Sequence, residues 1–297
     1  MQRLLGWVLA LAIVLRLAHH LPAQERLYVP GGLAGDDRSS MAVEGPASQS
    51  GWPDRGESVA LPQPGRFDLT DRVLAITRGR VQLEGGYVFT TDRAAGVRTS
   101  EHTVPDLLLR VGLTDRVELR LGWPGYVATV DEGPSGRQTS DRTLAPSVGA
   151  MLDLWPQRGC VPQTAVLAAV PITLNGNPLT MESFQPLSQV LYAWFPTERW
   201  SFGGTTGFSP LEECGDHFLQ FQQSVNTDYL LTERLGVFVE WIVLVDHGSA
   251  DDGSQHLLEG GFAFQCTERL RVSWRIGAGL NDRALDFLTG VRCAFRF

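Results

Sequence analysis

The 297-residue sequence contains no lysine, so arginine supplies all 25 of its basic side chains. Against them stand 33 acidic residues, which gives a net charge of −8 and leaves no basic stripe of the kind that binds nucleic acid. The four cysteines, Cys160, Cys214, Cys266 and Cys293, show no CxxC or other metal-ligand spacing. They could form two disulfides in an oxidising compartment, but their spacing does not specify a pairing. The composition therefore predicts no nucleic-acid partner, no metal and no cofactor.

A long apolar segment is also missing after the first residues of the chain. The longest later run, residues 235–245, carries Glu240 at its centre and falls short of the ~20 apolar residues that a spanning helix needs. Residues 1–23 have the charge, apolar core and small-residue end of a secretory signal peptide, with cleavage expected after Ala23. An N-terminal membrane anchor is the alternative, but Arg16 interrupts the apolar run too early for a span.

The next part of the sequence lacks any sustained periodicity. Residues 24–66 are rich in Gly, Pro, Ser and Asp, and such a composition buries too little apolar surface to offset the entropy of ordering the chain. We therefore predict a flexible periplasmic segment over residues 24–78, followed by a single β-domain over residues 79–297.

Apolar and polar residues alternate in segment after segment from residue 79 onward, which indicates strands exposed to different surroundings on their two faces. The expected strands are 79–91, 102–113, 116–128, 143–155, 161–173, 185–195, 199–208, 217–230, 235–246, 255–266, 269–280 and 285–297.

A short unit built around Thr, an acid and Arg recurs between these strands. Its copies are Leu113–Val117, Pro196–Trp200, Leu231–Leu235 and Cys266–Leu270, and each is typical of a tight hairpin turn. The other connections are longer, so short turns alternate with long loops in an up-and-down meander. This pattern predicts an all-β fold, a transmembrane up-and-down antiparallel β-barrel of about 12 strands in an outer membrane. Closure of the sheet would pair every backbone polar group within the lipid.

The free-energy cost of placing charge in lipid indicates which face of each strand points into the barrel and which faces the membrane. An arginine on the lipid face near the midplane costs ~2–4 kcal/mol, so the charged face should line the lumen. The expected lumen-lining residues are Glu84, Asp106, Arg110, Glu118, Arg120, Asp153, Glu240, Glu259, Arg271, Arg275, Asp286 and Arg292. Their nearly balanced charge suggests a ladder of ion pairs. A secreted β-sandwich or lipocalin-like barrel is the soluble alternative, and it would turn its apolar face inward.

The last segment, VRCAFRF, continues the alternation to the final residue. The strand 285–297 should pair with 79–91 to close the barrel. Its aromatic ending, Phe295 and Phe297, resembles the targeting signature that the barrel-assembly machinery reads. The expected partners are therefore this machinery, outer-membrane lipids and a small-molecule solute.

Three stretches resemble an outer-membrane family labelled "putative MetA-pathway of phenol degradation": GRVQLEGGYVFT (79–90), HTVPDLLLRVGLTDRVELRLGW (102–123) and GAGLNDRALDFLTGVRCAFRF (277–297). Thr70-Asp71-Arg72 also matches a segment that precedes the first strand in that family, although VLAITR follows here where the family has a Pro-Asp-Phe pattern. The resemblance covers about residues 66–297. It implies uptake of hydrophobic aromatic solutes and names no binding residues.

The loop DHGSADDGS offers two further chemistries at the expected outer rim. His247 beside Ser249 could serve an outer-membrane lipase or esterase, because a base next to a hydroxyl is what nucleophilic catalysis requires. Asp246, Asp251 and Asp252 could instead hold Ca²⁺. A solvated loop is the simplest interpretation. We therefore expect a channel or transporter for small, hydrophobic or aromatic solutes rather than an enzyme, with the rim lipase and a non-conducting structural or adhesion barrel as alternatives.

Overall fold

The computed structural model describes residues 75–94, 96–134, 136–172, 186–213, 216–248 and 253–297. The expected signal peptide and residues 24–74 of the expected periplasmic segment lie outside the described residues. The chain divides into two units, Met1–Ala47 and Ser48–Phe297, and every described residue belongs to the second. The described part of the chain contains no helix that is long and apolar enough to cross a membrane.

Thirteen strands form the described structure, and all of their pairings are antiparallel. They are β1 (Val81–Ala94), β2 (Val97–Gly112), β3 (Val117–Gly133), β4 (Gly136–Thr143), β5 (Ser147–Trp155), β6 (Gln163–Pro171), β7 (Leu187–Trp194), β8 (Trp200–Glu213), β9 (Asp216–Leu230), β10 (Leu235–His247), β11 (Gly253–Gln265), β12 (Leu270–Gly279) and β13 (Phe287–Arg296).

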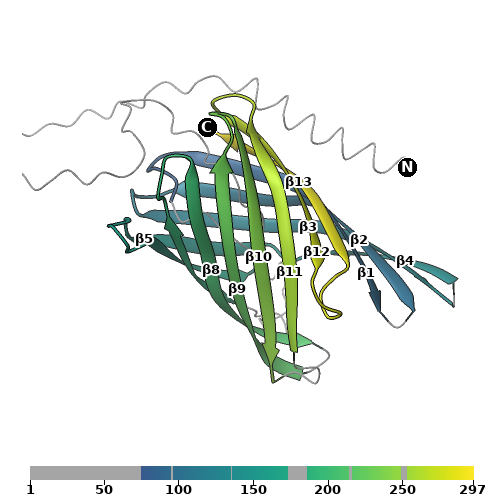
Figure 1. The fold of residues 1–297 in the computed structure, drawn as a ribbon. Coiled ribbons are helices and arrows are strands. Elements are labelled where there is room, and N and C mark those ends of the chain that lie inside the picture. The colour runs from purple at the N-terminus through teal and green to yellow at the C-terminus, as the bar shows by residue number, and fades with distance from the viewer. Residues whose placement is uncertain (1–74, 95, 135, 173–185, 214–215, 249–252) are drawn as a thin grey trace, which may run out of the picture. The chain divides into compact units, whose positions relative to one another are not determined.

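The sheet closes on itself because β1 pairs with β13 along most of its length, from Gln82 opposite Arg296 to Thr91 opposite Phe287. The remaining strands pair with their neighbours in the chain, except that β4 and β5 both pair with β3, and β2–β3 completes the ring (Figure 1). The expected up-and-down barrel is thereby confirmed. A closed sheet leaves no unpaired edge, which is the condition for crossing lipid with strands.

The fourth expected strand, 143–155, is wrong in its extent, and so is the loop expected before it. Residues 136–143 form β4, which pairs with the C-terminal half of β3, from Tyr126 to Gly133. β5 pairs with the N-terminal part of β3, from Val117 to Gly122. β4 and β5 thus occupy one position in a twelve-stranded wall. The alternation missed β4 because the strand, GRQTSDRT, is exposed along its whole length and contains no apolar residue.

Alternation of exposure along each strand separates an inner face from an outer one. In β12, Arg271, Ser273 and Arg275 are buried, whereas Ile276 is 41% exposed. Because successive side chains of a strand point to opposite faces, the polar residues point into the barrel and the apolar ones point out. This is the inverse of a soluble barrel, so the soluble alternative is wrong.

The recurring threonine unit forms hairpin turns, as expected. In the turn before β10, Thr232 Oγ1 accepts hydrogen bonds from the backbone N–H groups of Arg234 (3.2 Å) and Leu235 (3.0 Å). Thr114, Thr197 and Thr267 make the same pair of bonds in their own turns. A threonine hydroxyl that accepts from nearby backbone N–H groups fixes a turn conformation. By the rule that short turns of such barrels are periplasmic, these turns mark the periplasmic end.

We expect Thr232→Val to lower the free energy of unfolding by about 0.5–1.5 kcal/mol, because the turn loses its hydroxyl acceptor. Urea unfolding of the refolded protein in lipid vesicles measures the loss. Thr232→Ser keeps the hydroxyl and should retain most of the stability. An equal loss in both variants would show that the methyl group, not the hydroxyl, stabilises the turn.

Candidate functional site

The inner wall of the barrel carries most of the charged residues that the alternation assigned to the lumen. Nine of them are buried there: Glu84, Arg110, Glu118, Arg120, Glu240, Glu259, Arg271, Arg275 and Arg292. Asp106 and Asp153 are half-buried and accept hydrogen bonds from Arg292 and from the backbone N–H of Ala75, respectively. Asp286 is exposed and precedes β13, so it lies outside the wall. The role of this set in selecting a solute stays a prediction.

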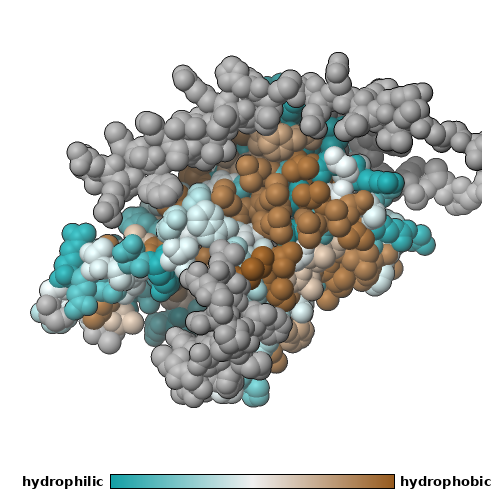
Figure 2. All heavy atoms as spheres, turned by 180° about the vertical axis from the view of Figure 1, so that it is seen from behind, coloured by the Kyte–Doolittle hydropathy of each residue, from teal (hydrophilic) through white to brown (hydrophobic). Residues whose placement is uncertain are grey.

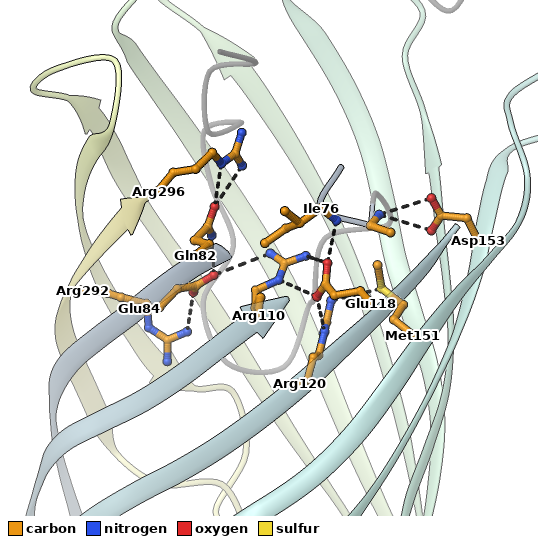
Figure 3. Close-up of polar contacts among 11 residues, drawn as sticks. Ile76, Gln82, Glu84, Arg110, Glu118, Arg120, Met151, Asp153, Arg292 and Arg296 are labelled. Atoms are coloured by element: carbon orange, nitrogen blue, oxygen red, sulfur yellow. Dashed lines mark hydrogen bonds and ion pairs between the residues drawn. The ribbon is translucent and has the colours of Figure 1, made fainter. Parts of the chain in front are cut away.

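Glu118 of β3 is the centre of a buried network near the periplasmic end (Figure 3). Arg110 of β2 donates to both of its carboxylate oxygens, from Nε at 2.6 Å and from Nη2 at 2.9 Å. Arg120, two residues further along β3, donates from Nε at 2.8 Å. A fourth bond comes from the backbone N–H of Ile76 at 2.7 Å. One fully buried carboxylate thus holds two guanidinium groups and the chain that leads into β1.

The network continues across β1 to β13. Glu84 lies 3.5 Å from Arg110 and 3.4 Å from Arg292, and Arg292 also bonds to Asp106. Gln82 donates to Glu84 at 2.7 Å and accepts from Arg296. The ion pairs therefore join neighbouring strands along the wall, as the balanced charge suggested. Arg275 and Glu259 form a similar pair at 3.1 Å between β12 and β11.

The neighbouring part of the inner wall, on β5, β6 and β7, is apolar at the same end of the barrel. Met151, Ala165, Leu167, Leu191 and Ala193, from β5, β6 and β7, form a buried cluster against which Ala75 and Phe195 pack. The two surfaces meet where Arg120 Nη2 lies 3.0 Å from Met151 Sδ. This surface agrees with the sequence, because the segment 161–173 is apolar on both faces. The interior therefore presents a charged wall beside an apolar wall.

A second apolar cluster lies toward the long-loop end. It consists of Ile242, Leu257, Ala284 and Leu288, with Leu244 and Leu285 packed against it. Ala284 belongs to the connection between β12 and β13 and is 3% exposed, so this connection contributes to the interior. The interior therefore contains apolar clusters at two levels of the barrel.

The chain that precedes β1 is tied to the inner wall, although a flexible segment was expected to reach residue 78. Asp153 accepts from the backbone N–H of Ala75 at 3.2 and 3.3 Å, and Ile76 is 5% exposed. The carbonyl oxygens of Ile76 and Thr77 lie so close to Gly112 that a Cβ there would be 2.3–2.4 Å from them. Ala75 and Ile76 are therefore held at the inner wall, because the Asp153 and Glu118 carboxylates accept hydrogen bonds from their backbone N–H groups, whereas Thr77 and Arg78 are exposed.

Several buried polar residues of the inner wall escaped the sequence analysis. They are Gln82, Gln189, Thr205, Gln222, Ser224, Asn226 and Asp228. Gln189 donates to Gln222 at 2.7 Å, and the hydroxyls of Thr205 and Ser224 lie 3.0 Å apart. The uncharged members were missed because charge was the signal used to find the lumen, whereas Asp228 carries that signal and was missed nonetheless. Arg296 was also missed, although it follows Arg292 by four residues in the last strand and so points to the same face of that strand.

The rim residues are described only in part. His247 is exposed at the end of β10, while Ser249, Asp251 and Asp252 lie outside the described residues. Asp246 accepts a hydrogen bond from Gln220 at 2.9 Å. Within the described ranges there is no group of three His, Cys, Asp or Glu side chains that could hold a metal ion.

Three of the four cysteines and the two final aromatic residues lie in the described part of the chain. Cys160, Cys266 and Cys293 are free thiols, and Cys214 has no described side chain. The rings of Phe295 and Phe297 meet edge to face at 4.9 Å, and the Phe297 N–H donates to Val81 O at 2.9 Å. Their role as an assembly signal stays a prediction.

The outer face of the barrel is apolar. Large exposed side chains recur on neighbouring strands, among them Val225, Val239, Trp241, Leu258, Phe262, Ile276 and Val291. Figure 2 shows a broad hydrophobic area on this surface. Aromatic pairs such as Trp123–Tyr126, at 5.4 Å, add the amphipathic rings that favour membrane interfaces. An exposed apolar surface around a charged interior identifies the outer face as the lipid-contacting surface of an outer-membrane barrel.

Solved structures share this architecture. The chain matches an outer membrane channel from Pseudomonas putida F1 with a TM-score of 0.53 and 14% identity, over 78% of this chain and 100% of that one. At this identity the likeness concerns the fold. The NanC porin (TM-score 0.43, 9% identity, 72% and 98% covered) and the translocator domain of the autotransporter NalP from Neisseria meningitidis (0.46, 12%, 73% and 88%) are more distant.

A search of curated protein sequences finds no match. A family model, in contrast, matches residues 65–297, which is most of the chain and all of the barrel. The match agrees with the resemblance in the first and last strands. The chain belongs to the family described as "Putative MetA-pathway of phenol degradation".

Proposed function

We propose that the barrel is an outer-membrane channel that lets small solutes with an apolar or aromatic part cross passively, without catalysis. The observation that carries this proposal is an inner wall that is charged in one part and apolar in the neighbouring part. Arg110, Glu118 and Arg120 lie on β2 and β3, and Leu167 and Leu191 lie on β6 and β7. Such a lining offers apolar contact to one part of a solute and polar contact to another, and solute selectivity in pores follows from the groups that line them. Membership of a family named for phenol degradation is consistent with an aromatic solute.

Single-channel recording of the refolded full-length protein in planar bilayers tests conduction. We expect discrete current steps, and liposome swelling should show faster uptake of a phenol-sized aromatic alcohol than of a sugar. Absence of both current steps and solute flux would overturn the channel and favour the non-conducting structural barrel. Ester hydrolysis by the purified protein would instead support the rim lipase.

Selectivity should depend on the apolar wall. Replacing Leu167 or Leu191 with Gln should lower the ratio of aromatic to sugar flux by about fivefold, which corresponds to about 1 kcal/mol of lost apolar contact. Leu113→Gln is a matched control, because Leu113 is 49% exposed in a periplasmic turn. A heat-modifiable band on gels verifies that each variant is folded. An unchanged flux ratio in folded Leu167 and Leu191 variants would contradict a role for the apolar wall.

A further inference from the structure

Arg271 differs from the other arginines of the inner wall. It is the second residue of β12, lies opposite Gln265 and Ala294 on the neighbouring strands, and is 4% exposed. Its Nε and Nη1 atoms are buried and have no hydrogen-bond partner among the described residues. In contrast, Arg110, Arg120, Arg275 and Arg292 each bond to a carboxylate.

The surroundings of Arg271 add positive charge rather than balance it. The charged groups that interact with it are Arg296 and Arg292, both on the inner face of β13. Arg292 bonds to Glu84 and Asp106, and Arg296 donates to the neutral amide oxygen of Gln82. The inner-face neighbours Ser273 and Ala294 carry no charge.

A buried cation without a counter-charge is costly. The penalty amounts to several kcal/mol per ion after relaxation, and a buried donor without an acceptor adds to it. Lysine or histidine could escape by losing its proton, but the guanidinium of arginine stays charged in proteins. Buried polar atoms that lack a protein partner commonly bind an ion or a water that completes the site. The chemistry that best completes a guanidinium is a carboxylate.

We infer that Arg271 is a binding residue for the carboxylate of a small organic anion in the lumen. The inference rests on the proposed function, because it names the chemical class of solute that the channel would select. That solute has an apolar or aromatic body, suited to the apolar wall, and one acidic group. Positive charge from Arg292 and Arg296 would attract the same group toward β12 and β13.

Thermal unfolding of the refolded full-length protein in detergent tests this binding without requiring conduction. Sodium benzoate serves as the probe, and sodium chloride and benzyl alcohol at equal concentrations serve as comparisons. We expect benzoate to raise the unfolding temperature in a saturable way, since a ligand that binds only the folded state stabilises it. Arg271→Gln should weaken the apparent benzoate affinity by at least about tenfold, the equivalent of a lost charge-assisted hydrogen bond.

Two further variants make the test specific. Arg271→Lys can still present an ammonium group to a bound carboxylate and should retain a measurable benzoate response. Arg142→Gln removes an arginine whose side chain is 61% exposed, 3.1 Å from Glu101, and should behave as the unaltered protein does. Without added anion, Arg271→Gln should be at least as stable as the original, because it removes an unbalanced buried charge.

The outcomes separate this inference from the proposed function. An equal benzoate response in the original protein and in Arg271→Gln would overturn the inference, as would an equal response to chloride, which would indicate a simple counter-ion. Current steps without benzoate binding would support the proposed channel and contradict the proposed carboxylate site at Arg271. Benzoate binding that depends on Arg271, together with no conduction, would support the site and contradict the channel.

Discussion

Replacing Glu118 with glutamine is expected to lower the free energy of unfolding of the barrel by about 3–5 kcal/mol, because it removes the buried counter-charge that Arg110 and Arg120 share. The Glu118 side chain is fully buried, and it binds Arg110 through both oxygens and Arg120 through one. Glutamine is nearly the same size, so the expected loss comes from the charge rather than from a cavity. The backbone N–H of Ile76 would also lose a charged acceptor.

Urea unfolding in lipid vesicles, followed by gel mobility and tryptophan fluorescence, measures this loss. Glu132→Gln is the matched control, since Glu132 pairs with Arg137 at 3.8 Å and both side chains are more than half exposed. Exposed pairs contribute ~0–1 kcal/mol, so the control should remain near the original stability. Neutralising Arg110 and Arg120 together with Glu118 should recover part of the loss. If the single Glu118 variant is as stable as the control, the buried network does not stabilise the barrel.

Placing an arginine on the outer face at Leu258 is expected to cost about 2–4 kcal/mol when the barrel is folded in a bilayer. Leu258 lies near the middle of β11, is 43% exposed and is paired with Trp241 and Ala278, which share its face. At that depth the guanidinium would have to leave water for hydrocarbon. The adjacent residue, Glu259, is charged and buried on the opposite face of the strand. A charge is therefore tolerated on the inner face at position 259 but is costly on the outer face at position 258.

Equilibrium unfolding in vesicles tests the outer face directly. Leu258→Met keeps an apolar side chain of similar volume and should cost less than ~1.5 kcal/mol. Leu113→Arg introduces the same charge at an exposed turn position, where arginine costs only ~0–1 kcal/mol because it reaches the interface. A Leu258→Arg barrel as stable as Leu113→Arg would show that this surface does not face lipid.

The strands themselves were predictable because their signal is local. In β12, polar side chains alternate with apolar ones, so the sequence shows which face of the strand is polar: Arg271, Ser273 and Arg275 on one face, and Val272, Trp274 and Ile276 on the other. The free-energy cost of charge in lipid then indicates that the polar face points into the barrel. The threonine turns were predictable for the same reason, since Thr232 bonds only to residues two and three positions away. β4 could not be found this way, because it is exposed on both faces and has no apolar residue to mark a strand.

Pairing among the charged residues was not predictable, because it depends on the register of strands that are distant in sequence. Glu84 and Arg292 meet across 208 positions of the chain, and only the pairing of β1 with β13 brings them together. The same register places Arg271 among arginines, a difference from Arg275 that the sequence does not reveal.

The sequence by itself therefore determined the class of fold, the inner and outer face of each strand and the position of the turns. These properties follow from the two-residue period of a strand and from the expense of charge in lipid, both of which act locally. Only the tertiary structure decided that Glu118 joins two arginines to the chain before β1, that an apolar wall adjoins them, and that Arg271 lacks a carboxylate partner among the described residues. Those features arise where a closed barrel brings remote strands together, because closure fixes which side chains share the interior.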